Sequence, residues 1–425
     1  MGGVINLCRL RLTYQLWYNL NNQPLVEPNI QKWGMTVKKT LILGGGIGGV
    51  ESAIFLRKEG FEVTLISNRD YFYVYPLSIW IPTGEIEFED TCLPLKDLAE
   101  KHGFQLIIDE VLQIEAEGHR VLLKEMGEYR DYDYLIIALG GGKLKPKGAE
   151  HALSICEDPK ISLVLKDKLE KVLAKGEGKL AVGFGGNPKD NSAVRGGPAF
   201  EFILNLDHLL RKRKLRDKFE LTFFAPMENP GAKMGDKAVK ETIIWFDKLN
   251  IKMHVGKKIK EFEEDGVRFE DDSKLLSDYT MFISAGTGHK AIEDSDLPVN
   301  ESGFITINRH CQVEGYDNIF AVGDAAALEG PQWKSKQGHI AELMARNTAV
   351  NISNIEKGSP ERESYVEHLS ILCVMDSGNG AAYVHRDDQK EVMVKLPVVG
   401  HWLKKGWGVY YKLAKMGKIP RIPGM

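Results

Sequence analysis

A glycine-rich turn near the start of the chain has residues suited to holding a phosphate group. The apolar run 40–43 leads through Gly44, Gly46 and Gly49 into a helix-forming stretch. Gly44 permits a tight turn, Gly46 lets the backbone approach a pyrophosphate, and Gly49 lets the helix pack closely on the strand. The N-terminus of that helix faces the phosphate charge. The predicted cofactor-binding residues of this turn are Gly44, Gly46, Ile47, Gly48 and Gly49.

The end of the second predicted strand, 61–67, lies where such a site meets the adenosine ribose. An acid usually stands there, about 20 residues past the glycine turn. This chain has Ser67 and Asn68 instead, followed by Arg69. A hydroxyl or amide can bond a ribose, whereas Arg69 suits a 2′-phosphate. The position therefore leaves FAD, NAD and NADP open, with Ser67 and Asn68 as the predicted cofactor contacts.

Three further strand-like runs belong to the same predicted sheet, at 105–108, 134–138 and 318–321. Continuous apolar runs closed by turn residues are typical of strands buried on both faces. We expect a helix to begin at Asp324, whose carboxylate would accept from a cofactor hydroxyl or act as an ordinary N-cap. The cofactor-binding residues predicted after these strands are Val111, Gly140, Gly323 and Asp324.

A second α/β unit begins with the strand 179–182 and also opens onto glycines. Gly183 and Gly185 occupy the first two glycine positions, but Pro188 stands at the sixth, and the helical segment 198–214 begins later. A helix that packs directly on its strand needs a small residue at that sixth position. We therefore interpret this unit as the relic of a nicotinamide site.

Length and composition define the class of protein. At 425 residues, with 43% hydrophobic and 27% charged residues, the chain is too long for one ordinary core. Five cysteines do not suggest a secreted disulfide framework, and no run is long and apolar enough to span a membrane. We predict an α/β fold with two tandem Rossmann-like dinucleotide-binding domains and a C-terminal membrane-associating helical region. The expected divisions are 1–34, an N-terminal extension that is disordered or reflects a misassigned start; 35–150, the first segment of the FAD domain; 151–285, the second Rossmann-like domain; 286–352, the second FAD segment; and 353–425, a quinone- and membrane-facing region.

The C-terminal tail predicts a basic amphipathic helix. After Glu391 its only charged residues are basic. On a helical wheel Trp402, Val409, Leu413 and Met416 share one side, whereas Lys404, Lys405, Lys412, Lys415 and Lys418 fall opposite. Lysines attract an anionic membrane surface, and aromatic residues suit its headgroup level. A helix packed on its own domain has the same periodicity, but the absence of acids favours the membrane.

Taken together, these motifs resemble the pyridine nucleotide-disulfide oxidoreductase superfamily, and within it the sulfide:quinone oxidoreductases. The glycine turn resembles the FAD phosphate loop, and the run 318–326 resembles the ribityl-binding motif. Four local matches indicate the narrower family. They are 154–156 (SIC), 197–202 (GPAFEF), 373–378 (CVMDSG) and the tail from His401-Trp402-Leu403-Lys404 to Tyr410-Tyr411.

The resemblance implies that Cys156 and Cys373 form a redox pair beside the flavin. Hydrosulfide would attack their disulfide, and a lowered thiol pKa would favour the chemistry. Many relatives have a third cysteine shortly before the SIC match; it is absent here, which implies a two-cysteine variant with non-covalent FAD. Glu201 would act as a proton carrier, although a paired structural glutamate fits equally well. Lys336 and Gly338 resemble the lysine–x–glycine turn near the flavin.

The implied partners are sulfide and a membrane quinone, with no metal and no nucleic acid. We expect a peripheral, monotopic membrane protein, the cytoplasmic face being favoured, and a homo-oligomer is compatible with the sequence. The sequence does not identify the quinone, the length of the sulfur product or the cysteine nearer the flavin. Two alternatives remain open: a type II NADH:quinone oxidoreductase, and the flavin subunit of a cytochrome-linked sulfide dehydrogenase. Pro188 and the two cysteines oppose the first, and the basic tail would have no role in the second.

Overall fold

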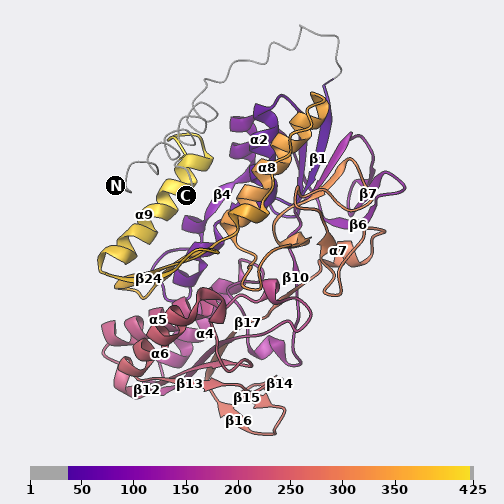
Figure 1. Cartoon of the computed structure of the whole chain (residues 1–425). Helices are drawn as coiled ribbons and strands as arrows, with labels where there is room; N and C mark the ends of the chain where they lie inside the picture. The colour runs from indigo at the N-terminus through magenta and orange to yellow at the C-terminus, as the bar shows by residue number, and fades with distance from the viewer. Residues whose placement is uncertain (1–36, 422–425) are drawn as a thin grey trace, which may run out of the picture.

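The computed structural model describes residues 37–421, so the predicted extension 1–34 lies outside the described residues. Two parallel sheets, each flanked by helices, lie at opposite ends of the molecule, and the C-terminal segment runs along one edge (Figure 1). The predicted α/β class and the tandem arrangement are therefore confirmed.

The first sheet contains every strand that the sequence analysis placed in it. Four of its strands are buried over almost their whole length, whereas the edge strand 105–108 is partly exposed. In sheet order they are β20 (Ile319–Ala321), β9 (Tyr134–Ile137), β1 (Lys39–Leu43), β2 (Glu62–Ser67) and β5 (Gln105–Ile108), all parallel. The helices of this unit are α2 (Ile47–Lys58), α3 (Leu95–His102) and α8 (Gly338–Glu356). An antiparallel sheet of β6 (Val111–Glu115), β7 (Arg120–Leu123) and β8 (Gly127–Tyr129) adjoins them.

Two details of the second FAD segment differ from expectation. Residues Gly323–Ala325 form only a single 3₁₀ turn, followed by the short strand β21 (Ala326–Ala327). Asp324 therefore does not begin an α-helix, because the chain re-enters a two-stranded pairing with β19 (Ile305–Thr306). The helix that follows, α8, continues to Glu356, so the division predicted at 352 falls within its last turn.

The second sheet is also parallel and carries the predicted strand and helix. Its order is β13 (Ile251–Val255), β12 (Phe219–Ala225), β11 (Gly178–Phe184) and β17 (Tyr279–Ile283). The helices are α4 (Ile161–Leu173), α5 (Gly197–Lys212) and α6 (Asp236–Lys248), and β14 (Ile259–Glu263), β15 (Gly266–Phe269) and β16 (Lys274–Leu276) form an antiparallel sheet beside them.

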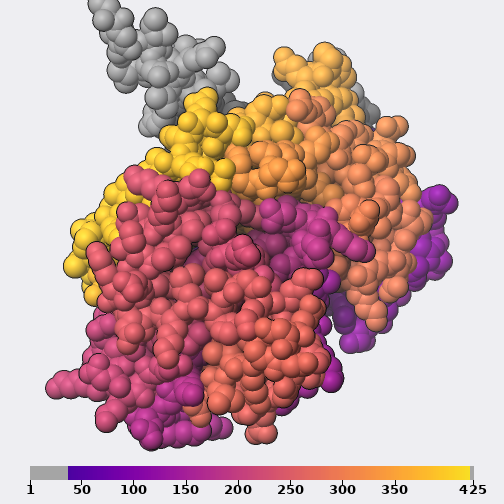
Figure 2. Space-filling view, turned by 60° about the horizontal axis from the view of Figure 1, so that its bottom comes forward, coloured from indigo at the N-terminus to yellow at the C-terminus, as the bar shows by residue number. Residues whose placement is uncertain are grey.

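The C-terminal region is an antiparallel sheet followed by one helix. Its elements are β22 (Ile371–Asp376), β23 (Gly380–Arg386), β24 (Glu391–Pro397) and α9 (Val399–Lys415). This region lies against the second unit along one edge of the molecule (Figure 2). Short elements complete the fold: β3 (Tyr71–Tyr73), β4 (Cys92–Pro94), β10 (Gly142–Lys143), β18 (Gly286–Thr287) and α7 (Lys290–Glu293). Between residues 37 and 421, no helix combines the length and apolar character that crossing a membrane requires.

Candidate active site

The first glycine turn is tight where the chain must turn and open where a ligand would lie. Gly44 has a φ of +111°, and a methyl group there would collide with the carbonyl oxygen of Ala138. A methyl group on Gly49 would collide with the Gly44 carbonyl, so close packing of α2 on β1 requires glycine. Over Gly46, by contrast, no atom lies within 4 Å of a built Cβ. The first turn of α2 contains no acid, so its unpaired N–H groups are available to an anion.

The second FAD segment, which begins at residue 286, packs against this turn. A Cβ on Gly338, at the start of α8, would lie 3.1 Å from the Cδ1 of Ile47. A Cβ on Gly48 would lie 3.0 Å from a methyl group of Val322. The predicted cofactor residues at 44–49, 323 and 338 are thus brought together from distant parts of the chain.

The remaining predicted cofactor residues of the first unit have varied surroundings. The Ser67 hydroxyl donates to the carbonyl of Arg69 at 2.7 Å and accepts from its N–H at 3.2 Å, whereas Asn68 is exposed. Gly140 has a φ of +76° and open space around it. Val111 is buried at the start of β6.

Two basic residues contact the second FAD segment from outside it or within it, and both are at least partly buried. Arg195, which the sequence analysis did not identify, forms an ion pair with Asp324. The Nζ of Lys336 donates to the carbonyl oxygen of Ala326 and lies 3.9 Å from the ring centroid of Phe304. Burial lowers the pKa of Lys336 to about 7. Pairing of Asp324 with Arg195 depends on a residue far away in sequence, so no local signal predicted it.

These features fit a dinucleotide with a flavin. The open cradle at Gly46 and the helix terminus suit a pyrophosphate, and a cation such as Lys336 suits the negative charge that a flavin acquires on reduction.

Cys373 lies in a buried cluster with a carboxylate and an ammonium group. Its Sγ donates to Oε1 of Glu201 at 3.8 Å, and Oε2 of Glu201 is ion-paired with Lys404. Burial, and then the charge of Glu201, raises the pKa of Cys373 to about 12. Burial also raises the pKa of Glu201, more than the contact with Lys404 lowers it. Glu201 is thus paired with Lys404, as one of its two predicted roles requires, and its role as a proton carrier stays a prediction.

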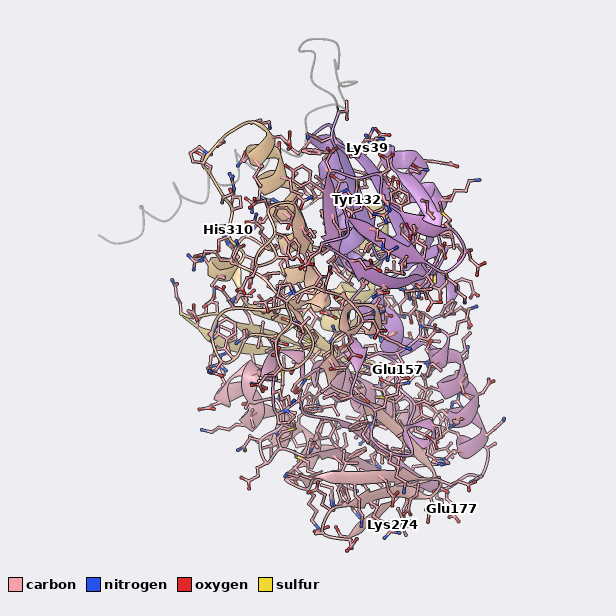
Figure 3. The ribbon with its side chains drawn as sticks, turned by 90° about the vertical axis from the view of Figure 1, so that its right-hand side faces the viewer. Lys39, Tyr132, Glu157, Glu177, Lys274 and His310 are labelled. Carbon is pink, nitrogen blue, oxygen red and sulfur yellow. The ribbon has the colours of Figure 1, made fainter. Side chains whose placement is uncertain are left out.

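Cys156, the second predicted thiol, is buried. Its neighbour Glu157 is labelled in Figure 3, between Lys39 at one end and Lys274 at the other. Burial raises the pKa of Cys156, opposed by Lys143 and Arg195. Cys156 and Cys373 are free thiols in this structure, and Glu201 acts electrostatically on both. Both thiol pKa values are thus raised, contrary to the lowering that would favour the chemistry, because both sulfurs are buried.

A second buried group adjoins the Cys373 cluster. Asp376 is fully buried and accepts from Nε1 of Trp80 at 3.0 Å, and its other carboxylate oxygen lies 2.8 Å from Nδ1 of His401. The Asp376 N–H donates to Glu201 Oε2 at 3.1 Å. Burial alone would raise the pKa of Asp376, but the hydrogen bonds from His401 and Trp80 lower it. The sequence analysis noted 373–378 and His401 only as parts of matched motifs and did not predict that they meet.

The orientation predicted for α9 is wrong for most of its lysines. Lys404 and Lys415 are buried and paired with Glu201 and Glu51, respectively. Lys405 pairs with Glu85, and Lys412 donates to the carbonyl oxygen of Asp90. Lysine stems reach inward because buried carboxylates on other elements need a counter-charge. The exposed face of α9 is instead apolar, with Trp402, Leu403 and Val409 each more than half exposed.

Comparison with known proteins agrees with this geometry. The pyridine nucleotide-disulphide oxidoreductase family matches residues 38–346. A sulfide-quinone reductase of Aquifex aeolicus is 29% identical over 408 residues, covering 88% of this chain and 90% of the relative. A type II NADH:quinone oxidoreductase of Staphylococcus saprophyticus is 26% identical over 377 residues, covering 83% and 90%. The crystal structure of the A. aeolicus sulfide:quinone oxidoreductase superposes with a TM-score of 0.80 at 26% identity, covering 90% of this chain and 92% of that chain.

The chain therefore belongs to the pyridine nucleotide-disulphide oxidoreductase family. It is an oxidoreductase that uses FAD, as the resemblance of its motifs implied.

Proposed function

We propose that this protein oxidises sulfide to zero-valent sulfur and passes the electrons through FAD to a membrane quinone. The reacting groups in this proposal are Cys156 and Cys373. The similarity to a sulfide-quinone reductase over most of both chains supports the substrates. The observation that carries the proposal is the cluster in which Cys373 Sγ lies 3.8 Å from Oε1 of Glu201 and Lys404 is paired with Glu201.

In the oxidised state the two cysteines would form a disulfide. Hydrosulfide attacks one of its sulfurs, the S–S bond breaks, and one cysteine becomes a persulfide while the other leaves as a thiolate. FAD, when bound, would supply the two-electron acceptor for this pair and pass the electrons to the quinone. As the disulfide re-forms, the outer sulfur of the persulfide would leave as zero-valent sulfur, with release of one proton. Glu201 holds a proton beside Cys373, and Lys336 offsets negative charge near the glycine turn.

The comparisons support one alternative, a type II NADH:quinone oxidoreductase. Such an enzyme must hold a nicotinamide nucleotide at the second glycine turn. There, however, the amide of Asn187 donates to the carbonyl oxygen of Gly286 at 3.0 Å and to Ser302 Oγ at 3.2 Å. Side-chain bonds thus hold the loop after the turn, and Pro188 stands where a helix would otherwise pack on the strand, which favours sulfide as the reductant.

The two functions are separated by which reductant bleaches the flavin. Purified, flavin-loaded protein is mixed anaerobically with sulfide or with NADH, and the flavin absorbance is followed. Rapid bleaching by sulfide, lost in Cys373→Ser and in Cys156→Ser, supports the proposal. Bleaching by sulfide that survives both substitutions would remove the cysteine pair from it.

We also propose that the protein sits peripherally on the membrane through the apolar face of α9. Exposed Val398, Val399, Trp402, Leu403 and Val409 form a continuous stretch of helix and preceding turn, and such a face suits the boundary between headgroups and acyl chains. Attachment would then depend on apolar burial, not on the lysines. The side of the membrane and the oligomeric state stay predictions from the sequence.

A point substitution tests this attachment better than removal of the tail, which would leave Glu201 and Glu51 buried without their lysines. Trp402→Glu should reduce flotation with phosphatidylcholine–phosphatidylglycerol vesicles severalfold while leaving sulfide-dependent bleaching intact. Ile244→Glu, at a residue of α6 with comparable partial exposure, is the control. Equal flotation of both variants and the unmodified protein would contradict the proposal.

A further inference from the structure

Two buried carboxylates lie side by side beneath the thiol site, and α9 supplies one partner to each. Glu201 of α5 and Asp376 of β22 are joined by the 3.1 Å hydrogen bond from the Asp376 N–H. Lys404 pairs with Glu201, and His401, one helical turn earlier, bonds Asp376. All four side chains are less than a tenth exposed.

The orientation of the His401 ring is fixed by Asp376. The carboxylate accepts from Nδ1, and its other oxygen is held by Trp80 at 3.0 Å and by the Gly378 N–H at 2.9 Å. Nε2 therefore points away from Asp376, and it lies 3.7 Å from Oε1 of Glu85, which itself pairs with Lys405. A carboxylate–histidine pair of this kind orients an imidazole for proton exchange at its other ring nitrogen.

His401 also lines a surface groove. Two adjoining cavities of about 310 and 280 Å³ share Glu85, His208, Lys212 and Gly378 as lining residues, and His401 lines the second. Of the four clustered side chains, His401 is the one that borders this groove. Glu201 at the other end of the cluster contacts Cys373.

Charge balance requires one additional proton in the cluster. Two carboxylates and one ammonium group carry a net charge of minus one, and an unbalanced charge is costly away from water. Neutrality is reached with the proton either on Glu201, next to Cys373, or on His401, next to the groove. Movement between these positions leaves the net charge unchanged, so burial does not oppose it.

We propose that this cluster carries a mobile proton between the thiol site and the surface groove, with Glu201 as its inner position and His401 as its outer position. In the transfer, the O–H bond of Glu201 breaks and an N–H bond forms at Nε2 of His401, with no electron moved. Because Nδ1 is bonded to Asp376 and Nε2 faces away from it, the proton reaches Nε2 from the groove. Lys404 is paired with Glu201, and its charge also acts on Asp376. Asp376 is a positioning residue. The inference rests on the proposed function only in treating Cys373 as the reacting thiol.

The protonation of Glu201 tests the proposal without turnover. Infrared absorption of the protonated carboxyl group, identified by its loss in Glu201→Gln, is titrated in flavin-loaded protein. In His401→Asn, which keeps a donor to Asp376, the proton has only the inner position, so the band should grow and persist at least one pH unit higher. His385→Asn is the matched control, because His385 forms a separate pair with Asp387 at 2.8 Å. An unchanged Glu201 band in His401→Asn would overturn the proposal.

Chemical rescue provides a second test. In His401→Ala we expect reoxidation of the flavin by a short-chain quinone to slow at least tenfold, and added imidazole to restore much of the rate. Slowing that imidazole does not relieve would indicate a structural role and contradict the proposal. If sulfide fails to reduce the unmodified enzyme, the proposed function fails, whereas the infrared titration still decides the proton route.

Discussion

The two Rossmann-like units begin with the same strand-and-glycine turn but use the following space differently. In the first, α2 begins at Ile47, directly after Gly46, and the space over Gly46 is open. In the second, β11 ends at Phe184 and α5 begins only at Gly197. The intervening loop is held by the Asn187 amide on Gly286 and Ser302. The length of chain between strand and helix, and not the number of glycines, therefore distinguishes the two turns.

The helices after the two turns also differ in the state of a buried glutamate. Glu51 of α2 and Glu201 of α5 each receive a lysine from α9, Lys415 and Lys404. Burial alone would raise the pKa of Glu51, but Lys415 and Arg421 together lower it to about 2. Burial raises the pKa of Glu201, and its single cation, Lys404, does not offset that effect. The first glutamate serves as a fixed anchor, whereas the second is suited to exchanging a proton.

The largest effect is expected from closing the open turn. Gly49→Ala would force α2 away from the Gly44 carbonyl and should reduce the bound flavin at least tenfold. The flavin-to-protein absorbance ratio measures this. Gly186→Ala in the second turn is the matched control, since its Cβ would meet only the Met227 Cε, at 3.7 Å. Equal flavin content in both variants would mean that the first turn does not hold the cofactor.

Removing Lys404, the partner of Glu201, should have the next largest effect and should lower the stability of the fold. Lys404→Met leaves Glu201 and Asp376 buried without this ammonium group, and the expected loss is about 3–5 kcal/mol in the free energy of unfolding. Urea denaturation of the flavin-loaded protein measures it, with the exposed Lys418→Met as control. Adding Glu201→Gln should recover part of the loss. A double variant as unstable as Lys404→Met would show that packing, and not charge, explains the effect.

Acid should weaken the ion pairs that Glu51 forms with Lys415 and Arg421. Because the folded pKa of Glu51 lies near 2, below its ordinary value of 4.5, its stabilisation is complete above about pH 5 and is lost as pH falls towards 2. A shift of this size corresponds to about 3 kcal/mol. Glu51→Gln should therefore flatten the acid limb of the unfolding free energy measured against pH. An unchanged acid limb would contradict the assignment to Glu51.

The smallest effect is expected from removing the Asn187 side chain, which holds the loop after the second glycine turn. Asn187→Ala removes the bonds of the amide to Gly286 and Ser302 and those that its oxygen accepts from the Lys189 and Asp190 N–H groups. This should cost about 1–3 kcal/mol of unfolding free energy without loss of flavin. The same denaturation and absorbance measurements apply. A large loss of flavin in this variant would show that the second turn contributes to the cofactor site.

The sequence predicted the parts of this molecule that depend on local pattern. Strands buried on both faces, such as β1 and β9, follow from continuous apolar runs, and the turn at Gly44 follows from glycine spacing. The residue contacts that define the candidate site, Arg195 with Asp324 and His401 with Asp376, join segments far apart in the chain. Only the folded arrangement brings such partners together.

The orientation of α9 shows the same limit. Its sequence predicts a helix with one apolar and one basic face, and the structure has both. Periodicity identifies two faces but does not say which one is buried. The buried carboxylates of Glu51 and Glu201 decide this, because each holds a lysine of α9 inward. A rule that places lysines outward fails where distant acids are already buried.

The central claim is tested most directly by an anaerobic titration of flavin-loaded protein with sulfide, followed by addition of a quinone. The account predicts that sulfide bleaches the flavin, that the quinone restores its colour, and that NADH does neither. Bleaching by NADH with no response to sulfide would contradict it.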